Sequence, residues 1–168
     1  MDSKLLELKA RVESLDVMRE RVLSLKPVHV GTFRQVDTYF NSSKGRLKLR
    51  EDNSKENAKL IYYLREDITG PKRSEIILID IQEPSAFKKL FRDLIGERVI
   101  VDKEREIYTY NETQIHLDMV KDLGTFIEFE RRITDLKNDH LVIRDLMKRL
   151  QIKEKDLIQG SYSDLIKP

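Results

Sequence analysis

The chain has 168 residues, of which 32 are basic, 30 are acidic and none is cysteine, so its net charge is only +2. This length predicts a single domain spanning residues 1–168, and the absence of cysteine excludes disulfides, thiolate metal sites and cysteine nucleophiles. No apolar stretch approaches the roughly 20 residues that a membrane span needs, and the sequence Met1-Asp2-Ser3-Lys4 does not resemble a signal peptide. We therefore expect a folded cytoplasmic protein with no membrane partner.

The predicted elements alternate between two periodicities. Strand-like segments with a period of two cover, in chain order, residues 6–12, 29–40, 46–50, 61–65, 73–80, 97–110, 112–120 and 125–131. Helical spacing of apolar residues predicts three helices, around Leu15 to Leu25, from Pro84 to Leu94, and around Val142 to Leu150. The charged stretch 51–59 is expected to connect two strands of a hairpin.

Charged side chains are segregated by strand face. Leu6 and Leu8 fall on the face opposite Glu7 and Lys9, and the strand 46–50 places three cations on one face with no acid between them. One interpretation is that these ions face water on a one-sided antiparallel sheet. The other is that they line the inside of a barrel, with the apolar faces turned outward under the helices. Clustered cations suit phosphate and clustered carboxylates suit a hard metal, which favours the second interpretation.

The order of elements indicates the α+β class. One strand, a helix, four strands, a helix, three strands and a final helix follow one another, and several connections are too short for a parallel crossover. Eight strands are also the number at which a sheet closes with little interior room. The prediction is an eight-stranded antiparallel, closed or nearly closed β-barrel with the helices packed outside.

Six motifs, in register along nearly the whole chain, resemble one known family. They are Glu7-Leu8-Lys9, the segment 35–40 (QVDTYF), the segment 45–50 (GRLKLR), Lys103-Glu104-Arg105, His116-Leu117-Asp118 and the segment 124–130 (GTFIEFE). Together they resemble the CYTH superfamily of triphosphate tunnel metalloenzymes. The closing segment 160–166 (GSYSDLI) is most similar to the class IV adenylyl cyclase branch.

This resemblance implies a basic tunnel that binds a triphosphate, with Mg²⁺ or Mn²⁺ as cofactor. The implied substrate-binding residues are Lys9, Lys48, Arg50, Arg65, Arg73, Lys103 and Arg105, and Lys9, Arg50, Lys103 and Arg105 are also the implied catalytic residues. The implied metal ligands are Glu7, Asp118, Glu128 and Glu130. The expected substrate is ATP, thiamine triphosphate or inorganic triphosphate, and the expected reaction is adenylyl cyclisation or triphosphate hydrolysis. A homodimer is left open.

One position departs from the family pattern Glu-x-Glu-x-Lys, because Leu5 stands at the first glutamate. The loss of a carboxylate predicts weakened metal binding, a changed metal preference, or lost turnover with binding retained. The alternative function is therefore a non-catalytic triphosphate or nucleotide sensor. For Lys9, the alternative to a phosphate contact is a proton acceptor with a lowered pKa.

A barrel that binds nucleic acid is a further alternative. In it, Tyr39, Phe40, Tyr62 and Tyr63 would stack on bases. The isoelectric point of about 8.7 and the interleaved acids argue against nucleic acid as a partner. His29 and His140 are expected at the surface or an edge, whereas His116 shares the strand face of Asp118.

Overall fold

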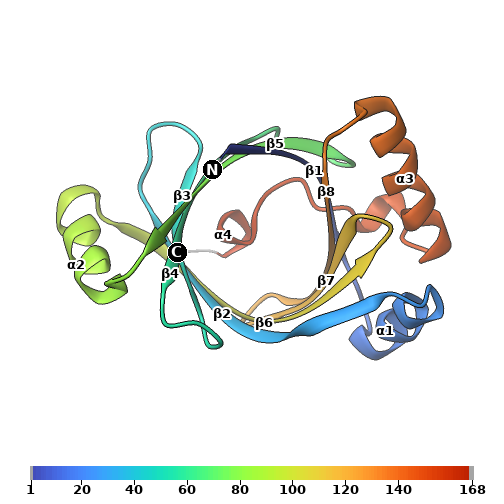
Figure 1. The fold of residues 1–168 in the computed structure, drawn as a ribbon, viewed down its shortest axis with the longest axis horizontal. Helices are drawn as coiled ribbons and strands as arrows, with labels where there is room; N and C mark the ends of the chain where they lie inside the picture. Colours follow the sequence, from blue (N-terminus) through green and yellow to red (C-terminus); the bar gives the residue numbers. More distant parts are fainter. Residues whose placement is uncertain (1, 167–168) are drawn as a thin grey trace.

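The computed structural model describes residues 2–166, and its eight strands form one closed antiparallel barrel (Figure 1). The strands are β1 (Asp2–Arg11), β2 (Val28–Phe40), β3 (Arg46–Asp52), β4 (Ala58–Arg65), β5 (Lys72–Ile81), β6 (Glu97–Tyr110), β7 (Thr113–Val120) and β8 (Gly124–Arg132). Around the barrel they follow the order β1-β5-β4-β3-β2-β6-β7-β8. The predicted fold class is confirmed. The expected connection at 51–59 is shorter than predicted, because β3 continues to Asp52 and β4 begins at Ala58.

The main hydrophobic core lies outside the barrel. On β1, Leu6 and Leu8 are fully buried on the outer face, where they belong to the same cluster as Ile143 and Leu146 of the helix α3 (Leu136–Arg149). Alternation along the strand turns the charged residues between them toward the interior. The structure therefore supports the second of the two interpretations, in which the ions line the inside.

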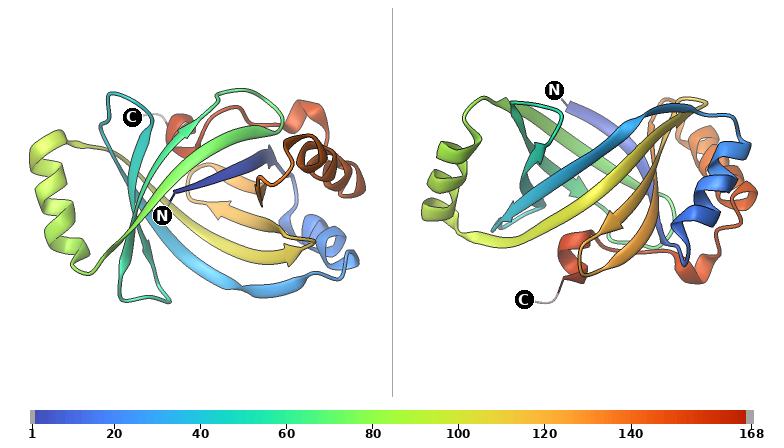
Figure 2. Two further views of the ribbon diagram at one scale, coloured as in Figure 1. Left: turned by 45° about the horizontal axis from the view of Figure 1, so that its top comes forward. Right: turned by 90° about the horizontal axis from the view of Figure 1, so that it is seen from below.

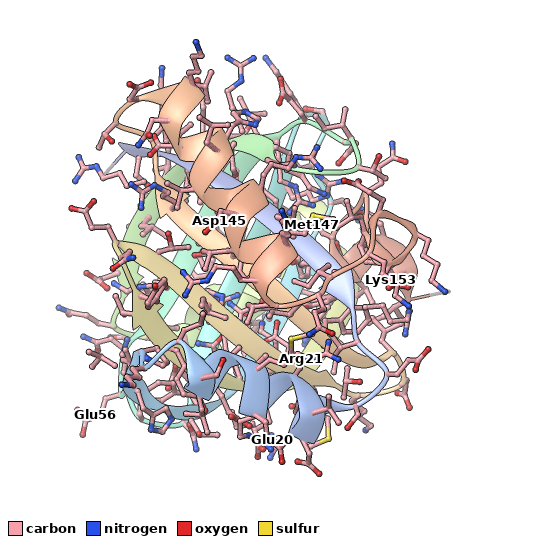
Figure 3. The ribbon with its side chains drawn as sticks, turned by 90° about the vertical axis from the view of Figure 1, so that its right-hand side faces the viewer. Glu20, Arg21, Glu56, Asp145, Met147 and Lys153 are labelled. Atoms are coloured by element: carbon pink, nitrogen blue, oxygen red, sulfur yellow. The ribbon has the colours of Figure 1, made fainter. Side chains whose placement is uncertain are left out.

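Three helices cover the outer surface. Figure 3 shows α3 and α1 (Leu15–Ser24) lying across the same side of the barrel, where the Arg21 guanidinium donates to the carbonyl oxygen of Leu150 at 3.2 Å. The helix α2 (Pro84–Ile95) packs Phe87 and Phe91 on the outer face of β2 and β3. Within residues 2–166, no helix is both long and apolar enough to span a membrane.

The segment after α3 was not predicted to carry structure. It contains a short 3₁₀ helix, η1 (Glu154–Asp156), and the one-turn helix α4 (Tyr162–Leu165). Figures 1 and 2 show α4 standing over one mouth of the barrel. The buried ammonium of Lys72 fixes this segment by donating to the carbonyl oxygens of Ile158 and Gln159 at 2.6 and 2.7 Å.

A buried ion pair attaches α3 to β8. The Arg131 Nε donates to the carboxylate of Asp139 at 2.6 Å, and the backbone N–H groups of Thr134 and Asp135 donate to its other oxygen. Burial alone would raise the pKa of Asp139, but these hydrogen bonds and the charge of Arg131 hold the pKa below its ordinary value.

We predict that Asp139→Asn lowers the free energy of unfolding by about 3–5 kcal/mol, because it leaves a buried arginine without its counter-ion. Asp145→Asn, on the exposed side of the same helix (Figure 3), should change it by less than about 0.5 kcal/mol. Since the pKa of Asp139 is lower in the folded than in the unfolded protein, its stabilisation is present at neutral pH and is lost as the pH falls below about 4. Urea denaturation at about pH 7 and about pH 3 should show the difference between Asp139→Asn and wild type shrinking in acid. Equal effects of the two substitutions at neutral pH would contradict this account.

Candidate active site

The interior of the barrel holds a cavity of about 250 Å³. Six of the predicted cationic residues line it, and they come from four different strands: Lys9 of β1, Lys48 and Arg50 of β3, Arg65 of β4, and Lys103 and Arg105 of β6. Each lies at an alternate position of its strand, between residues that face the outside. The antiparallel register thus brings positions far apart in the sequence to one enclosed space.

A single carboxylate compensates three of these cations. Asp37 of β2 is 1% exposed and accepts hydrogen bonds from Lys48 at 2.9 Å, Arg50 at 2.7 and 2.8 Å, and Lys103 at 2.9 Å. Burial opposes its ionisation, but the charges of Arg50, Lys103 and Lys48 hold the pKa of Asp37 well below its ordinary value. Burial also lowers the pKa of Lys103. Sequence reasoning did not single out Asp37, because an isolated aspartate in a strand has no distinctive pattern.

A second set of ion pairs surrounds Arg105. Its guanidinium contacts Asp118 through two nitrogens at 2.7 and 2.6 Å, and Glu128 at 2.9 Å. The ammonium of Lys9 lies 3.4 Å from Glu128, and burial lowers its pKa. Asp118 is fully buried and also accepts a hydrogen bond from the hydroxyl of Tyr162.

A metal-ligand cluster lies beside these pairs. Donor atoms of His116, Glu128 and Glu130 all lie within 4.8 Å of one another. Burial, together with the nearby carboxylates of Glu128 and Glu7, raises the pKa of Glu130 to about 7. Burial and the charge of Arg105 lower the pKa of His116 to about 3, so its imidazole is neutral.

Two of the four predicted metal ligands, Glu128 and Glu130, belong to this cluster. Glu7 lines the same cavity and accepts from Arg65 at 3.1 Å, while Asp118 is engaged by Arg105. His116, which the structure adds as a candidate ligand, was not predicted as one. The feature of the sequence that could have indicated it is its position two residues from Asp118, which places both side chains on one strand face.

Arg73 lies apart from the other predicted cations. It pairs with Leu6 in the register of β1 and β5, so it is on the outer face, where it forms an exposed ion pair with Glu66. Its neighbour Lys72 pairs with Glu7 and is buried. A shift of one residue along a strand exchanges the two faces, so the sequence did not distinguish these two neighbours.

The C-terminal segment closes one end of the cavity. The ring of Tyr162 lies 3.6 Å from the ammonium of Lys9, and Ser161 accepts a hydrogen bond from Arg65 at 2.6 Å. At this end Arg46, at the start of β3, pairs with Asp164 of α4. Because β3 runs away from α4, the exposed residues Lys55 and Asn57 line the cavity at the opposite end, where it reaches solvent.

Comparison with known proteins assigns the fold to a family. Residues 4–162 match the model of the CYTH domain, so the chain belongs to the CYTH domain family. It is 26% identical, over 95% of its length and 96% of the relative's, to a Methanocaldococcus jannaschii protein named "Putative adenylate cyclase MJ0240". The structure of the PH1012 protein from Pyrococcus horikoshii is similar with a TM-score of 0.89 and 25% identity, covering 97% of this chain and 99% of that one.

A more distant solved structure belongs to a protein whose description mentions an enzymatic activity. It is the "Putative adenylyl cyclase HpAC1 from Hippeastrum", which is described as one that "reveals a dominant triphophatase activity". The similarity has a TM-score of 0.67 at 14% identity and covers 95% of this chain and 91% of that one. At this identity the likeness shows the fold alone.

We predict that Asp37→Asn lowers the free energy of unfolding of the ligand-free protein by about 3–5 kcal/mol, because the buried Lys103 and the partly buried Lys48 and Arg50 lose their shared counter-ion. Inorganic triphosphate should restore much of the loss, since its oxygens can replace the carboxylate. The measurement is thermal unfolding with and without triphosphate. Asp80→Asn, which breaks an exposed pair with Lys59, is the control and should change little. A Tm of Asp37→Asn equal to that of wild type would contradict the assigned role.

Proposed function

We propose that this protein is a metal-dependent enzyme that acts on a triphosphate bound inside the barrel. The observation that supports this most is the convergence of six cationic side chains from four strands on one enclosed cavity. Burying so many cations is costly unless anions compensate them. A polyanion that enters from the open end would supply this compensation and gain charge-assisted hydrogen bonds in return.

The side chains differ in what they offer a phosphate chain. Arg50 and Arg105 present planar guanidinium groups that can contact two oxygens at once, whereas Lys48 and Lys103 act as compact point charges. In the ligand-free protein the oxygens of Asp37 occupy the hydrogen-bonding positions of three of these cations. Triphosphate binding would therefore draw Lys48, Arg50 and Lys103 partly away from Asp37.

The carboxylates fit a divalent cation. Glu128 and Glu130 would hold Mg²⁺ or Mn²⁺, with Glu7 nearby, and the buried nitrogen of His116 that has no hydrogen-bond partner is an observation in favour of a bound cation there. A divalent ion supplies neutralisation of the charge on phosphate oxygens. Lys9, beside Glu128, is positioned either to contact a phosphate or to accept a proton from the attacking hydroxyl.

Two reactions are compatible with the side chains that line this cavity. In adenylyl cyclisation, the ribose 3′ oxygen of ATP bonds to the α-phosphorus, the bond to the bridging oxygen breaks, and pyrophosphate leaves. In hydrolysis, a water oxygen bonds to the terminal phosphorus and gives up its proton, the bond from that phosphorus to the bridging oxygen breaks, and phosphate and the diphosphate part are released. The name of the Methanocaldococcus jannaschii relative supports the first, and the activity ascribed to the Hippeastrum protein supports the second. In both reactions, positioning and charge neutralisation provide most of the catalysis.

A sensor that binds triphosphate without turnover is the second candidate. The observation that favours it is Leu5, which lines the cavity with a side chain that cannot bind a metal. An incomplete ligand set would leave the cationic part of the site intact.

The test is incubation of the protein with ATP, thiamine triphosphate or inorganic triphosphate, each with Mg²⁺ or Mn²⁺, followed by analysis of cyclic AMP, pyrophosphate and phosphate. Cyclic AMP with pyrophosphate identifies a cyclase, and phosphate identifies a triphosphatase. No product, with a triphosphate-induced rise in Tm, identifies a sensor. No product and no rise in Tm would reject triphosphate binding altogether.

Arg50→Ala should weaken triphosphate binding roughly 10- to 100-fold with or without metal, because two charge-assisted hydrogen bonds to phosphate are lost. Titration calorimetry with inorganic triphosphate measures the change. Arg73→Ala, on the outer face, removes the same charge and is expected to leave the affinity unchanged. Equal losses in the two variants would show that net charge, rather than the cavity, determines binding.

Glu130→Gln should abolish metal-dependent turnover while keeping most of the affinity for triphosphate without metal, because the amide is a much weaker ligand and the cations remain in place. Product formation and titration calorimetry measure the two properties separately. Glu75→Gln, at an exposed position of β5, is the control. Full activity of Glu130→Gln would remove this residue from the metal site.

A further inference from the structure

The Nδ1 nitrogen of His116, inside the barrel, has no hydrogen-bond partner. The side chain of His116 is 3% exposed, and its Nδ1 is a buried polar atom without a hydrogen bond. It lies 3.8 Å from the Oε1 of Glu130, beyond hydrogen-bonding distance. In the register of β7 and β8, His116 also stands directly opposite Glu128.

The other ring nitrogen determines which form of the imidazole is present. His116 Nε2 lies 3.0 Å from Oε1 of Gln114, an oxygen that can only accept, so Nε2 carries the hydrogen. In the neutral ring, Nδ1 then has a free lone pair. Histidines that bind metals commonly donate their second nitrogen to an acceptor in this way, which fixes the ring orientation.

Nδ1 lies 3.8 Å from Oε1 of Glu130, and a ring nitrogen of His116 lies within 4.8 Å of carboxylate oxygens of both Glu128 and Glu130. Three electron-pair donors therefore share a small space. Glu128 is already paired with Arg105 and Lys9, whereas Nδ1 of His116 has no partner, and a cation between the three would supply one. All three donor atoms are within 4.8 Å of one another. In an octahedral ion with bonds of about 2.1 Å, adjacent ligands are separated by about 3.0 Å and opposite ligands by about 4.2 Å, so the donor atoms must approach one another by up to about 2 Å for all three to contact one ion.

We infer that His116 Nδ1 is a metal ligand alongside Glu128 and Glu130, and that this mixed nitrogen and oxygen site takes a divalent first-row transition ion such as Mn²⁺ in preference to Mg²⁺. Imidazole suits transition ions, whereas Mg²⁺ is best served by oxygen ligands alone. The inference deepens the proposed function, on which it rests, by naming a ligand and the class of metal. Gln114 is the positioning residue that keeps the Nδ1 lone pair available.

The direct test uses a protein in which His116 is the sole histidine. His29→Gln and His140→Gln replace the two histidines outside the cavity, and the protein is prepared with either ¹⁴N- or ¹⁵N-labelled histidine. Pulsed electron paramagnetic resonance of bound Mn²⁺, with and without inorganic triphosphate, detects directly coordinated nitrogen. We expect a ¹⁴N coupling that changes to the ¹⁵N pattern with the label. A spectrum unaffected by the label would overturn the inference.

Three substitutions at two positions give the second measurement, in which Mn²⁺ and Mg²⁺ affinities are compared by titration. Gln114→Ala, at an exposed position, should weaken Mn²⁺ binding roughly 10- to 100-fold, and Gln114→Glu, which keeps an acceptor, should not. His116→Gln should weaken Mn²⁺ binding more than Gln114→Ala does. It should also weaken Mg²⁺ binding less than it weakens Mn²⁺ binding, so that the preference for Mn²⁺ is reduced. An unchanged preference in His116→Gln would also overturn the inference. If this variant does not fold, the labelled sole-histidine protein still decides.

The inference and the proposed function can fail separately. Triphosphate affinity without metal depends on the cations around Asp37 and is measured on the same samples. Triphosphate binding together with Mn²⁺ that has no coordinated nitrogen would reject His116 as a ligand and keep the proposed function. Coordinated nitrogen without any triphosphate binding would support the His116 site and reject the function.

Discussion

The structure depends on compensating charges that an antiparallel barrel has turned inward. An ion removed from water is costly unless a partner of opposite charge and hydrogen bonds replace the lost hydration. Asp37 meets this requirement for Lys48, Arg50 and Lys103, and Asp118 with Glu128 meets it for Arg105.

Placing ions inside forces the hydrophobic core to the outside. Strand alternation gives the inward charges of β1 and β3 apolar neighbours on the other face, and these neighbours must be shielded from water. The helices α1 and α3 supply this shielding for β1, β7 and β8, and α2 supplies it for β2 and β3. The strands are therefore held at a fixed spacing by packing that does not involve the cavity. The ion pairs inside can then contribute little net stability, although the loss of either partner of a pair remains costly.

Much of this could be predicted from periodicity, and the remainder depends on pairing between strands. Alternation in β1 and β3 indicated which residues share a face, and the segregation of like charges indicated an enclosed binding site. Alternation does not reveal which strand lies beside which, so neither the partners of Asp37 nor the approach of His116 to Glu130 was foreseen. The helix α4 was missed because four residues are too few to show a helical period.

Two regions of the lumen hold charge differently. Around Asp37 the cations outnumber the carboxylate that serves them, so this region has unused capacity to donate hydrogen bonds to an anion. Around Glu130 and His116 the electron-pair donors face one another, so this region has unused capacity to bind a cation. A bare triphosphate satisfies only the first region and a bare metal only the second, whereas a triphosphate carrying a divalent ion satisfies both at once. Under the proposed function, the ligand-free protein should therefore favour the metal complex over either component because of charge distribution alone, before any chemical step takes place.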